Sequence, residues 1–215
     1  PKNLSQVHLN NSGAEAIEAG MKFARKFTGK TEMVAMNGSY HGKTLGALSI
    51  TFNPKYRKAF KPLVEKVSFS PFGDMEKLRE TVNDQTAFVI LEPIQGESGI
   101  HVAPDGFLQD VRKLCDEKDI LLIFDEIQAG LGRTGKMWAH QHWDTAPDIL
   151  CLAKGIAGGV PMGATLVKSE ILDCISKGEH SSTFGGNPIS CAAGTATMQA
   201  LTQDKLVENS ANMGK

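Results

Sequence analysis

The 215-residue chain is long enough to bury one substantial hydrophobic core. Apolar residues make up 41% of it and charged residues 22%, as is typical of a globular protein. The net charge is −1 and the basic residues are scattered, so the sequence carries no signature of a nucleic-acid or membrane partner. The longest apolar runs, such as residues 120–124, are far too short to cross a bilayer.

Short apolar runs alternate with segments of helical periodicity along the chain. In chain order, the pattern predicts a strand at 7–9, a helix at 14–26, strands at 33–36 and 87–91, a helix starting at 107, and strands at 120–124, 149–152 and 163–167. The strands are mostly unbroken apolar runs, which is typical of parallel strands covered on both faces. We therefore expect an α/β fold with a mostly parallel sheet sandwiched by helices, and ligands at the carboxyl ends of its strands.

Both ends of the chain look cut. Pro1 is not an initiator residue, and the strand at 7–9 has nothing before it. Residues 206–215 run on from a helix without a terminal element. We expect residues 1–215 to be one domain of a longer chain, without its N-terminal segment and its C-terminal small domain.

The cysteines indicate a reducing compartment. They occur singly in apolar or helical stretches, with no CxxC pair and no disulfide framework, at Cys115, Cys151, Cys174 and Cys191. No signal peptide is visible. We expect buried, reduced thiols in a cytoplasmic protein.

The segment before the first helix suits a phosphate. Ser12 can cap the helix, and Glu15 completes a capping box of the S-x-x-E type. Gly13 and Ala14 leave the first backbone N–H groups uncovered at the positive end of the helix dipole. A plain capped helix is the alternative interpretation.

Two strands deliver ionisable side chains to the sheet edge. Asp125 follows the strand at 120–124 and could cap a helix or pair with the ring nitrogen of a pyridine cofactor. Lys154 follows the strand at 149–152, where partial desolvation would make its amine nucleophilic, although a structural lysine is the alternative. Phosphate site, acid and lysine occur in the order that a pyridoxal enzyme needs.

Two further patterns point to other chemistry and carry little weight. Gly130–Gly135 matches the G-x-G-x-x-G fingerprint, but five residues separate it from the preceding strand, where a dinucleotide site should open a helix at once. His140 and His142 form an H-x-H pair without a third ligand in register, so we expect no metal site.

The motifs together resemble the class III, or ω-amino, aminotransferases of the fold-type-I pyridoxal enzymes. The similarity covers nearly the whole chain, and the acetylornithine, ornithine, 4-aminobutyrate and putrescine aminotransferases share it. The matching segments, in order, are 11–15, 40–44, 92–97, 125–128, 132–136, 147–150, 153–155, 158–161 and 182–188.

The resemblance implies pyridoxal 5'-phosphate as the cofactor and Lys154 as its Schiff-base lysine and proton carrier. It implies a pyridoxal phosphate-binding large domain over residues 1–215 and a homodimer with a shared site. The other implied cofactor contacts are Ser12, Gly13 and Ala14 to the phosphate, Tyr40 stacked on the ring, Asp125 to the ring nitrogen, Gln128 to the phenolic oxygen and Thr183 to the phosphate across the dimer interface.

The resemblance also implies a substrate side formed by Lys43, Glu92, Glu97 and Ser182. Glu97 resembles the gating glutamate of the family, whose arginine partner would lie beyond Lys215. Lys43 stands where acetylornithine and ornithine enzymes usually carry a carboxylate-binding arginine. Because lysine lacks the bidentate fork, this departure favours an amine of the 4-aminobutyrate or putrescine type.

We therefore expect transfer of an amino group from an ω-amine or ω-amino acid to a 2-oxo acid, with 2-oxoglutarate implied by the resemblance. An aminomutase or decarboxylase of the same fold is the nearest alternative. A non-catalytic binding module is another, although such a module would not need Lys154, Asp125 and Gln128 together. A nicotinamide oxidoreductase is the third.

Overall fold

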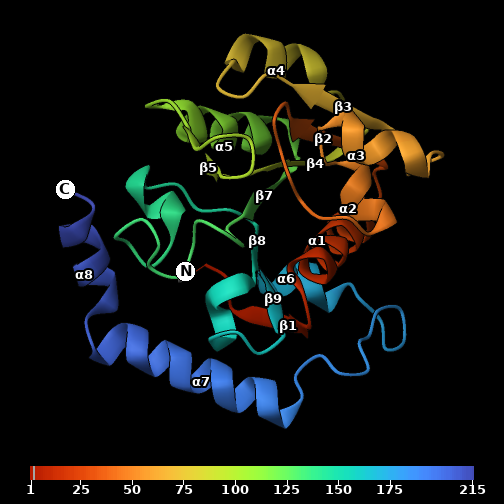
Figure 1. Cartoon of the computed structure of the whole chain (residues 1–215). Helices are drawn as coiled ribbons and strands as arrows, with labels where there is room; N and C mark the ends of the chain where they lie inside the picture. Colours follow the sequence, from red (N-terminus) through yellow and green to blue (C-terminus); the bar gives the residue numbers. More distant parts are fainter. Residues whose placement is uncertain (2) are drawn as a thin grey trace.

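A computed structural model describes residues 1 and 3–215. A seven-stranded sheet crosses the molecule in the order β1-β9-β8-β7-β4-β2-β3 (Figure 1). Its strands are β1 (Gln6–Asn10), β2 (Glu32–Met36), β3 (Val67–Ser70), β4 (Thr86–Leu91), β7 (Leu121–Asp125), β8 (Ile149–Leu152) and β9 (Gly163–Val167). A two-stranded ribbon pairs β5 (Ile94–Gln95) with β6 (His101–Val102).

The helices connect these strands. They are α1 (Gly13–Thr28), α2 (Leu45–Ser49), α3 (Pro54–Arg57), η1 (Lys58–Phe60), α4 (Met75–Thr81), α5 (Phe107–Lys118), η2 (Ala139–His142), η3 (Lys154–Ala157), α6 (Ser169–Asp173), α7 (Pro188–Gln203) and α8 (Leu206–Met213). Along the part of the chain that the structure describes, no helix combines the length and the apolar character needed to cross a membrane.

The predicted sheet is confirmed as mostly parallel. β2, β3, β4, β7 and β8 pair in parallel, whereas β9 is antiparallel to both of its neighbours, β1 and β8. The predicted strands lie within a residue or two of the observed ones. β3 was not predicted because its Val-Ser-Phe-Ser alternation belongs to an edge strand that is only partly covered.

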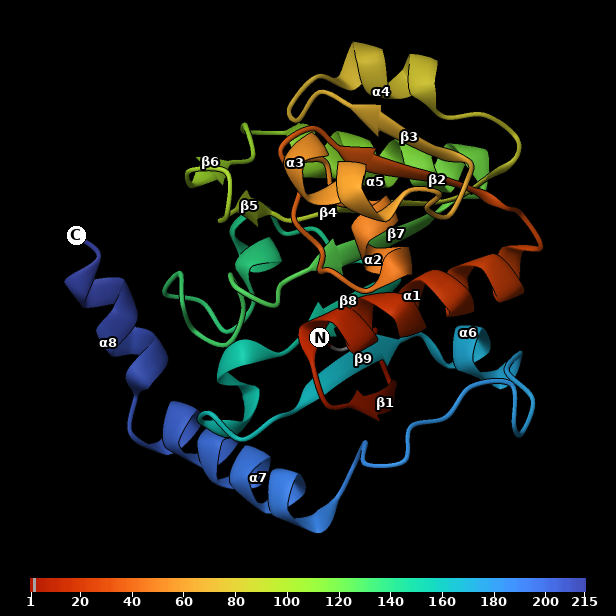
Figure 2. The same ribbon diagram turned by 45° about the vertical axis from the view of Figure 1, so that its right-hand side comes forward.

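The continuous apolar strands arise because helices cover both faces of the sheet. In β2, Val34 and Met36 join the core cluster beneath α4 and α5, whereas Met33 and Ala35 join the cluster beneath α1. Alternate residues of a strand point to opposite faces, so both sets must be apolar. Figure 2 shows the two helical layers on either side of the sheet.

The last two helices lie along the edge of the molecule in both views (Figures 1 and 2). α7 packs against η3, and α8 packs against α7. Residues 206–213 form a helix of their own, separated from α7 by a turn in which Lys205 has φ +54°. The expectation that this segment runs on from the preceding helix is therefore wrong.

The cysteines are all free, and only two of them are fully buried. Cys115 and Cys151 lie in the core, whereas Cys174 and Cys191 are half-buried. Burial raises the pKa of the Cys115 thiol to about 12 and raises that of Cys151 as well. The prediction of unpaired thiols is confirmed, and the prediction that all four are buried is wrong.

The buried carboxylate of Asp148 binds groups from a helix and from the ends of two strands. The Oδ2 atom of Asp148 accepts hydrogen bonds from Arg112 Nη1 at 2.7 Å and from the Leu122 N–H at 2.8 Å. Its Oδ1 atom pairs with Lys168 Nζ at 2.5 Å. Because all these donors face one carboxylate, the residue holds α5, β7 and the end of β9 together.

Replacing Asp148 with alanine should therefore lower the free energy of unfolding by about 3 kcal/mol, because the buried Leu122 N–H loses its acceptor and the Arg112 guanidinium keeps only its ion pair with the exposed Asp116. The measurement is urea unfolding of the full-length protein. The control is Glu80→Ala, since Glu80 pairs with Lys77 at 2.7 Å on the exposed surface and should change stability by less than about 1 kcal/mol. Equal losses in the two variants would contradict the prediction.

Candidate active site

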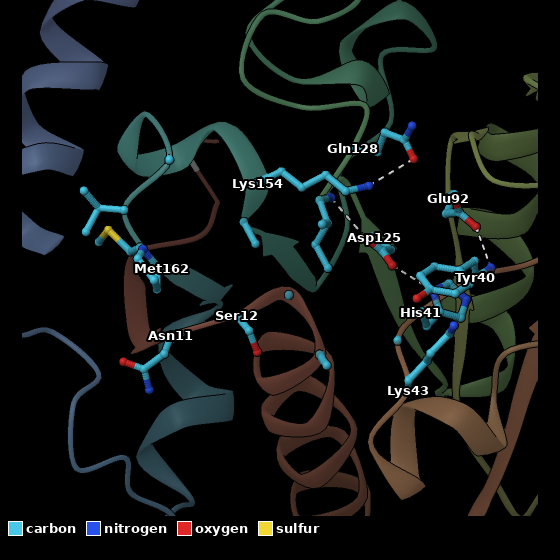
Figure 3. Close-up of a pocket in the computed structure, with 18 residues that line it drawn as sticks. Asn11, Ser12, Tyr40, His41, Lys43, Glu92, Asp125, Gln128, Lys154 and Met162 are labelled. Carbon is cyan, nitrogen blue, oxygen red and sulfur yellow. Dashed lines mark hydrogen bonds and ion pairs between the residues drawn. The ribbon is translucent and has the colours of Figure 1, made fainter.

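A cavity of about 340 Å³ opens at the carboxyl ends of β4, β7 and β8, beside the first turn of α1. Because β9 is reversed, the loop that enters it also reaches this edge and closes one side. The lining residues are Asn11–Ala14, Tyr40–Lys43, Glu92, Asp125, Ile127, Gln128, Ala153, Lys154 and 159–162 (Figure 3). Most of the predicted site residues therefore meet in one cavity.

The first turn of α1 faces this cavity. Ser12 Oγ accepts the Glu15 N–H at 3.2 Å, which confirms the predicted cap. The other half of the predicted capping box is wrong, because Glu15 Oε2 binds the N–H of Asn11 at 2.8 Å instead of that of Ser12. The N–H groups of Gly13 and Ala14 stay free of partners within residues 1 and 3–215, as the start of a helix allows.

Gly13 is required by close packing at this helix start. A Cβ atom on Gly13 would lie 2.9 Å from Ile127 Cδ1. Ile127 belongs to the turn that follows β7, so the missing side chain lets the strand end and the helix start approach each other. The free N–H groups and the Asp125 carboxylate consequently border the same cavity.

Asp125 ends β7 and is buried. Its Oδ1 atom accepts the Ile127 N–H at 3.0 Å, and its Oδ2 atom lies 2.8 Å from Nδ1 of His41. A carboxylate has about four lone-pair positions, so each oxygen can accept a further bond. Asp125 is thus held in place while remaining able to pair with a cationic group in the cavity.

Lys154 begins η3, directly after β8 and Ala153. Its backbone has φ +44°, a left-handed conformation that is costly for a residue with a side chain and is typical of functional positions. Its Nζ atom donates to Gln128 Oε1 at 3.1 Å. The prediction that burial partly desolvates this lysine is wrong, because the side chain is exposed on the open side of the cavity.

Tyr40 and Lys43 line the wall of the cavity formed by the segment that precedes α2 (Figure 3). Tyr40 contacts Tyr56 edge to face at 6.0 Å between ring centroids. The Lys43 ammonium lies 4.4 Å from the centre of the Tyr56 ring, a cation–π contact. This wall therefore combines an aromatic surface with a positive charge.

Glu92 is a buried carboxyl group beside them. Its oxygens accept the Tyr40 N–H at 3.0 Å and the Gly96 N–H at 3.3 Å. Burial raises the pKa of Glu92 to about 7, and Asp125 adds to the rise, while His41 and the two backbone N–H groups oppose it. Both oxygens hold backbone, so Glu92 positions the Tyr40 segment.

The raised pKa predicts that Glu92 destabilises the fold as it ionises. A glutamate of the unfolded chain ionises near pH 4.5 and the folded one near pH 7, so the penalty is absent below the first value and complete above the second. The stability of Glu92→Gln relative to wild type should rise across this window by roughly 1–3 kcal/mol.

Urea unfolding of both full-length proteins at a series of pH values measures this difference. The difference in the free energy of unfolding should be constant at low pH, rise between about pH 4.5 and 7, and be constant again at higher pH. A difference that is the same at every pH would show that the Glu92 carboxyl group ionises alike in the folded and unfolded chains.

The remaining predicted residues lie outside the cavity lining. Glu97 is exposed between β5 and β6. Thr183 is exposed in the loop before α7, and its neighbour Ser182 accepts hydrogen bonds from Asn11 Nδ2 and from the Gly185 N–H, both at 3.0 Å. Ser182 is therefore connected to the cavity through Asn11, whereas Glu97 and Thr183 are exposed and do not line it.

Sequence reasoning missed His41. This residue lines the cavity, is buried and contacts Asp125, yet only its neighbours Tyr40 and Lys43 were assigned roles. The available signal was a histidine inside a matched motif, but nothing local shows which distant carboxylate it meets. Met162 was missed as well, because its position depends on the reversal of β9.

The two competing patterns take up ordinary structural positions. The Gly130–Gly135 run forms turns between β7 and η2 and does not open a helix. His140 Nδ1 lies 2.7 Å from Glu126 Oε1, and His142 Nε2 lies 3.0 Å from Thr134 Oγ1, so the two rings have different partners.

The family profile described as aminotransferase class-III matches residues 1–215. The chain belongs to this family. Among the relatives of this class-III aminotransferase chain, the acetylornithine aminotransferase of Methanopyrus kandleri is 48% identical over 215 residues, which cover 100% of this chain and 55% of that protein. Ornithine aminotransferase 1 of Staphylococcus saprophyticus is 45% identical, over 99% of this chain and 56% of that protein.

Solved aminotransferase structures share the fold. The ornithine aminotransferase of Toxoplasma gondii superposes with a TM-score of 0.95 at 35% identity, covering 98% of this chain and 52% of that one. A pyridoxal phosphate-bound amine transaminase of an uncultivated Pseudomonas species gives 0.92 at 31% identity, covering 99% and 56%. The class-III chain described here thus spans about half the length of the curated relatives it matches.

Proposed function

We propose that this chain is the cofactor-binding part of a pyridoxal 5'-phosphate-dependent aminotransferase. The observation that carries the proposal is the meeting of Lys154, Asp125, Gln128 and the first turn of α1 around one cavity. These elements are far apart in the sequence, and each suits a different part of the same cofactor. The family membership of residues 1–215 supports the same assignment.

The side chains present fit the cofactor. Free N–H groups at the start of α1 can bind its phosphate, and the buried Asp125 carboxylate retains acceptor capacity for a protonated ring nitrogen. Tyr40 can cover a ring face, and the amine of Lys154 can attach the cofactor covalently. When bound, pyridoxal phosphate supplies an aldehyde that captures amines and a ring that stabilises the electron pair left by a departing proton.

Each of these protein groups has a separate role in the proposed reaction. Lys154 Nζ accepts and returns the proton that moves during amino transfer, and Gln128 Oε1 orients that amine through the 3.1 Å hydrogen bond. Asp125 keeps a negative charge near the ring nitrogen. The N–H groups of Gly13 and Ala14 fix the phosphate end, so the reacting atoms stay aligned with the lysine.

The substrate that we infer is an ω-amino acid or ω-amine, with a 2-oxo acid, 2-oxoglutarate in our proposal, as acceptor. Several relatives are named acetylornithine or ornithine aminotransferase, which favours a donor with an α-carboxylate. Lys43 offers that carboxylate a single ammonium group without the bidentate geometry of arginine. We propose Ser182 as a neighbour of the substrate and Glu97 as a gate that pairs with an arginine elsewhere in the full-length protein.

The test is an assay of purified full-length protein for glutamate formation from 2-oxoglutarate, with acetylornithine, ornithine, 4-aminobutyrate and putrescine as donors. The protein should also absorb at about 410–430 nm once pyridoxal phosphate is added, as lysine-bound pyridoxal phosphate does. Absence of both this absorbance and transamination would overturn the proposal. Release of carbon dioxide without glutamate would indicate a decarboxylase instead.

We also propose a homodimer in which Thr183 completes the phosphate site of the other subunit. Its exposed position outside the cavity of its own chain supports this arrangement. Phe184 and Ile189, on the same stretch of chain, are 70% and 75% exposed, so this segment offers apolar surface that a second subunit could cover. The oligomeric state of the full-length protein, measured by light scattering, tests the proposal, and a monomer that binds cofactor fully would contradict it.

Finally, we propose the cytoplasm as the location of the protein. The four cysteines are unpaired, and thiols persist in reducing compartments. Fractionation of the source cells tests this assignment.

A further inference from the structure

The loop of residues 174–187, which connects α6 to α7, is attached to α1 by charged side chains (Figure 2). Lys22 Nζ lies 2.9 Å from His180 Nδ1 and donates to the Glu179 carbonyl oxygen at 3.3 Å. Lys26 Nζ pairs with the Glu179 carboxylate at 2.8 Å. Because residues four positions apart share one face of a helix, the two lysines hold the same part of the loop.

The next residues of this loop reach the candidate site. Asn11, which lines the cavity, donates from Nδ2 to Ser182 Oγ at 3.0 Å, and Thr183 follows directly in the sequence. Only one residue separates His180 from Ser182, and one residue spans at most about 3.6 Å. The place of the His180 ring therefore limits where Ser182 and Thr183 can lie.

His180 packs in a cluster of three rings that come from three parts of the chain. Its ring centroid lies 4.7 Å from that of His8 on β1 and 5.2 Å from that of Phe23 on α1. The His8 and Phe23 rings contact each other edge to face at 5.6 Å. The residue of β9 that pairs with His8 is Thr165, which carries no charge. Two of the three rings in this cluster can thus bind a proton.

The contacts require both histidines to be neutral. The Lys22 ammonium group can only donate, so His180 must present a lone pair at Nδ1 and carry its proton at Nε2. His8 Nε2 is buried and has no hydrogen-bond partner within residues 1 and 3–215, and a charged N–H group would be costly there. Burial, followed by the charge of Lys22, lowers the pKa of both histidines.

Protonation would therefore weaken these contacts. A proton at His180 Nδ1 would face the Lys22 ammonium group, and a proton on His8 would add a second positive charge beside it. The other charged groups at the cluster are Lys26 and Glu179, which pair with each other. Because the pKa values of the folded histidines lie below the ordinary 6.5, the stabilisation by the cluster is complete above pH 6.5 and is lost as the pH falls.

We propose that His8, Lys22 and His180 form an acid-sensitive clasp that positions Ser182 and Thr183. The clasp is closed at neutral pH, where Lys22 donates to His180, and it opens when either histidine gains a proton. Its consequence for catalysis rests on the proposed function, in which Ser182 adjoins the substrate and Thr183 binds the phosphate in the other subunit. The clasp itself depends only on contacts within one chain.

Hydrogen exchange of the full-length protein, measured by mass spectrometry, tests the clasp. After correction for the intrinsic pH dependence of exchange, the peptide covering residues 176–187 should exchange about tenfold faster at pH 5.5 than at pH 7.5. The peptide covering α5 should keep the same corrected rate. Glu92 cannot produce the response of the loop, because acid removes its ionisation penalty and so stabilises the fold.

Two substitutions separate proton binding from packing. His180→Asn places an amide oxygen near the Nδ1 position, where it can accept from Lys22 without titrating, so the ratio of the two exchange rates should fall to about twofold. His8→Phe keeps an aromatic ring against His180 and should lower the ratio in part. The matched control is His142→Asn, since His142 is exposed on η2, and it should leave the tenfold ratio unchanged.

The same ratio in wild type, His180→Asn and His8→Phe would overturn the inference, as would a wild-type loop whose corrected exchange does not change with pH. Pyridoxal phosphate should also dissociate faster at pH 5.5 than at pH 7.5, and this acceleration should be smaller in His180→Asn. Equal acceleration in both proteins would overturn the positioning role. A wild type that binds no pyridoxal phosphate would overturn the proposed function, and hydrogen exchange would still decide whether the clasp exists.

Discussion

Replacing Lys154 with alanine should lower kcat/KM for transamination by at least about 10⁴-fold, because the substitution removes both the covalent attachment point and the proton carrier. In the wild type, borohydride reduction of the cofactor-loaded protein should leave the cofactor mass on the peptide containing Lys154. The variant should lack that adduct. Steady-state kinetics and peptide mass mapping of the full-length protein measure the two effects.

The matched control for this prediction is Lys136→Ala. Lys136 is exposed and donates to the Gln141 carbonyl oxygen at 3.0 Å, away from the cavity. This variant should retain both the adduct and the activity. A Lys154→Ala protein with activity within tenfold of wild type would contradict the assignment of Lys154 as the cofactor-binding lysine. An adduct on another lysine would show which residue has that role.

Replacing Asp125 with asparagine should lower kcat by about 10²–10³-fold, the size of effect expected when a preorganised charge partner is removed from a site. Asparagine keeps the shape of the side chain but carries no negative charge for the ring nitrogen. Its amide group also faces the His41 Nδ1 and Ile127 N–H donors, so one of these contacts becomes unfavourable.

Asp125→Glu and Glu126→Gln are the informative comparisons. The glutamate variant restores the charge at the wrong distance and should recover activity in part. Glu126→Gln disturbs the bonds to His140 and η2, so it should lower thermal stability while retaining the cofactor absorbance. Equal activity of Asp125→Asn and wild type would mean that the cavity does not use this charge.

The two experiments also separate the proposed function from the fold. Lys154 and Asp125 come from the ends of β8 and β7, which are neighbours in the sheet. The family membership establishes the fold on which they lie, whereas only kinetics and cofactor binding establish what they do. Loss of activity in both variants with unchanged melting temperatures would locate the chemistry at this sheet edge.

Much of the architecture could be predicted from local patterns. The unbroken apolar runs at β4, β7 and β8 identified the central strands, because a strand covered on both faces needs apolar side chains at every position. Ser12 identified the start of α1, because its hydroxyl group caps a free N–H group. These signals lie within a few neighbouring residues, so they can be read without knowledge of the fold.

The details of the site depended on contacts between distant segments. Asp125 and His41 are 84 positions apart in the sequence. Their contact depends on the order of the strands in the sheet and on the hydrogen bond from the His41 N–H to Thr51 Oγ1. The exposure of Lys154 likewise depends on which segments surround the cavity, which the strand before it does not reveal. For the same reason, Glu15 bonds to Asn11 where local capping rules predicted Ser12.

The sequence by itself determined the α/β class, the central strands and the start of α1, because each follows from short-range spacing and residue chemistry. It also placed Asp125 and Lys154 at strand ends, as candidates for cofactor contacts. Only the tertiary structure decided that β9 runs in reverse, that His41 meets Asp125, and that Thr183 lies outside the lining of the cavity in its own chain. Those features depend on strand order and on the packing of segments far apart in the chain, which local periodicity does not specify.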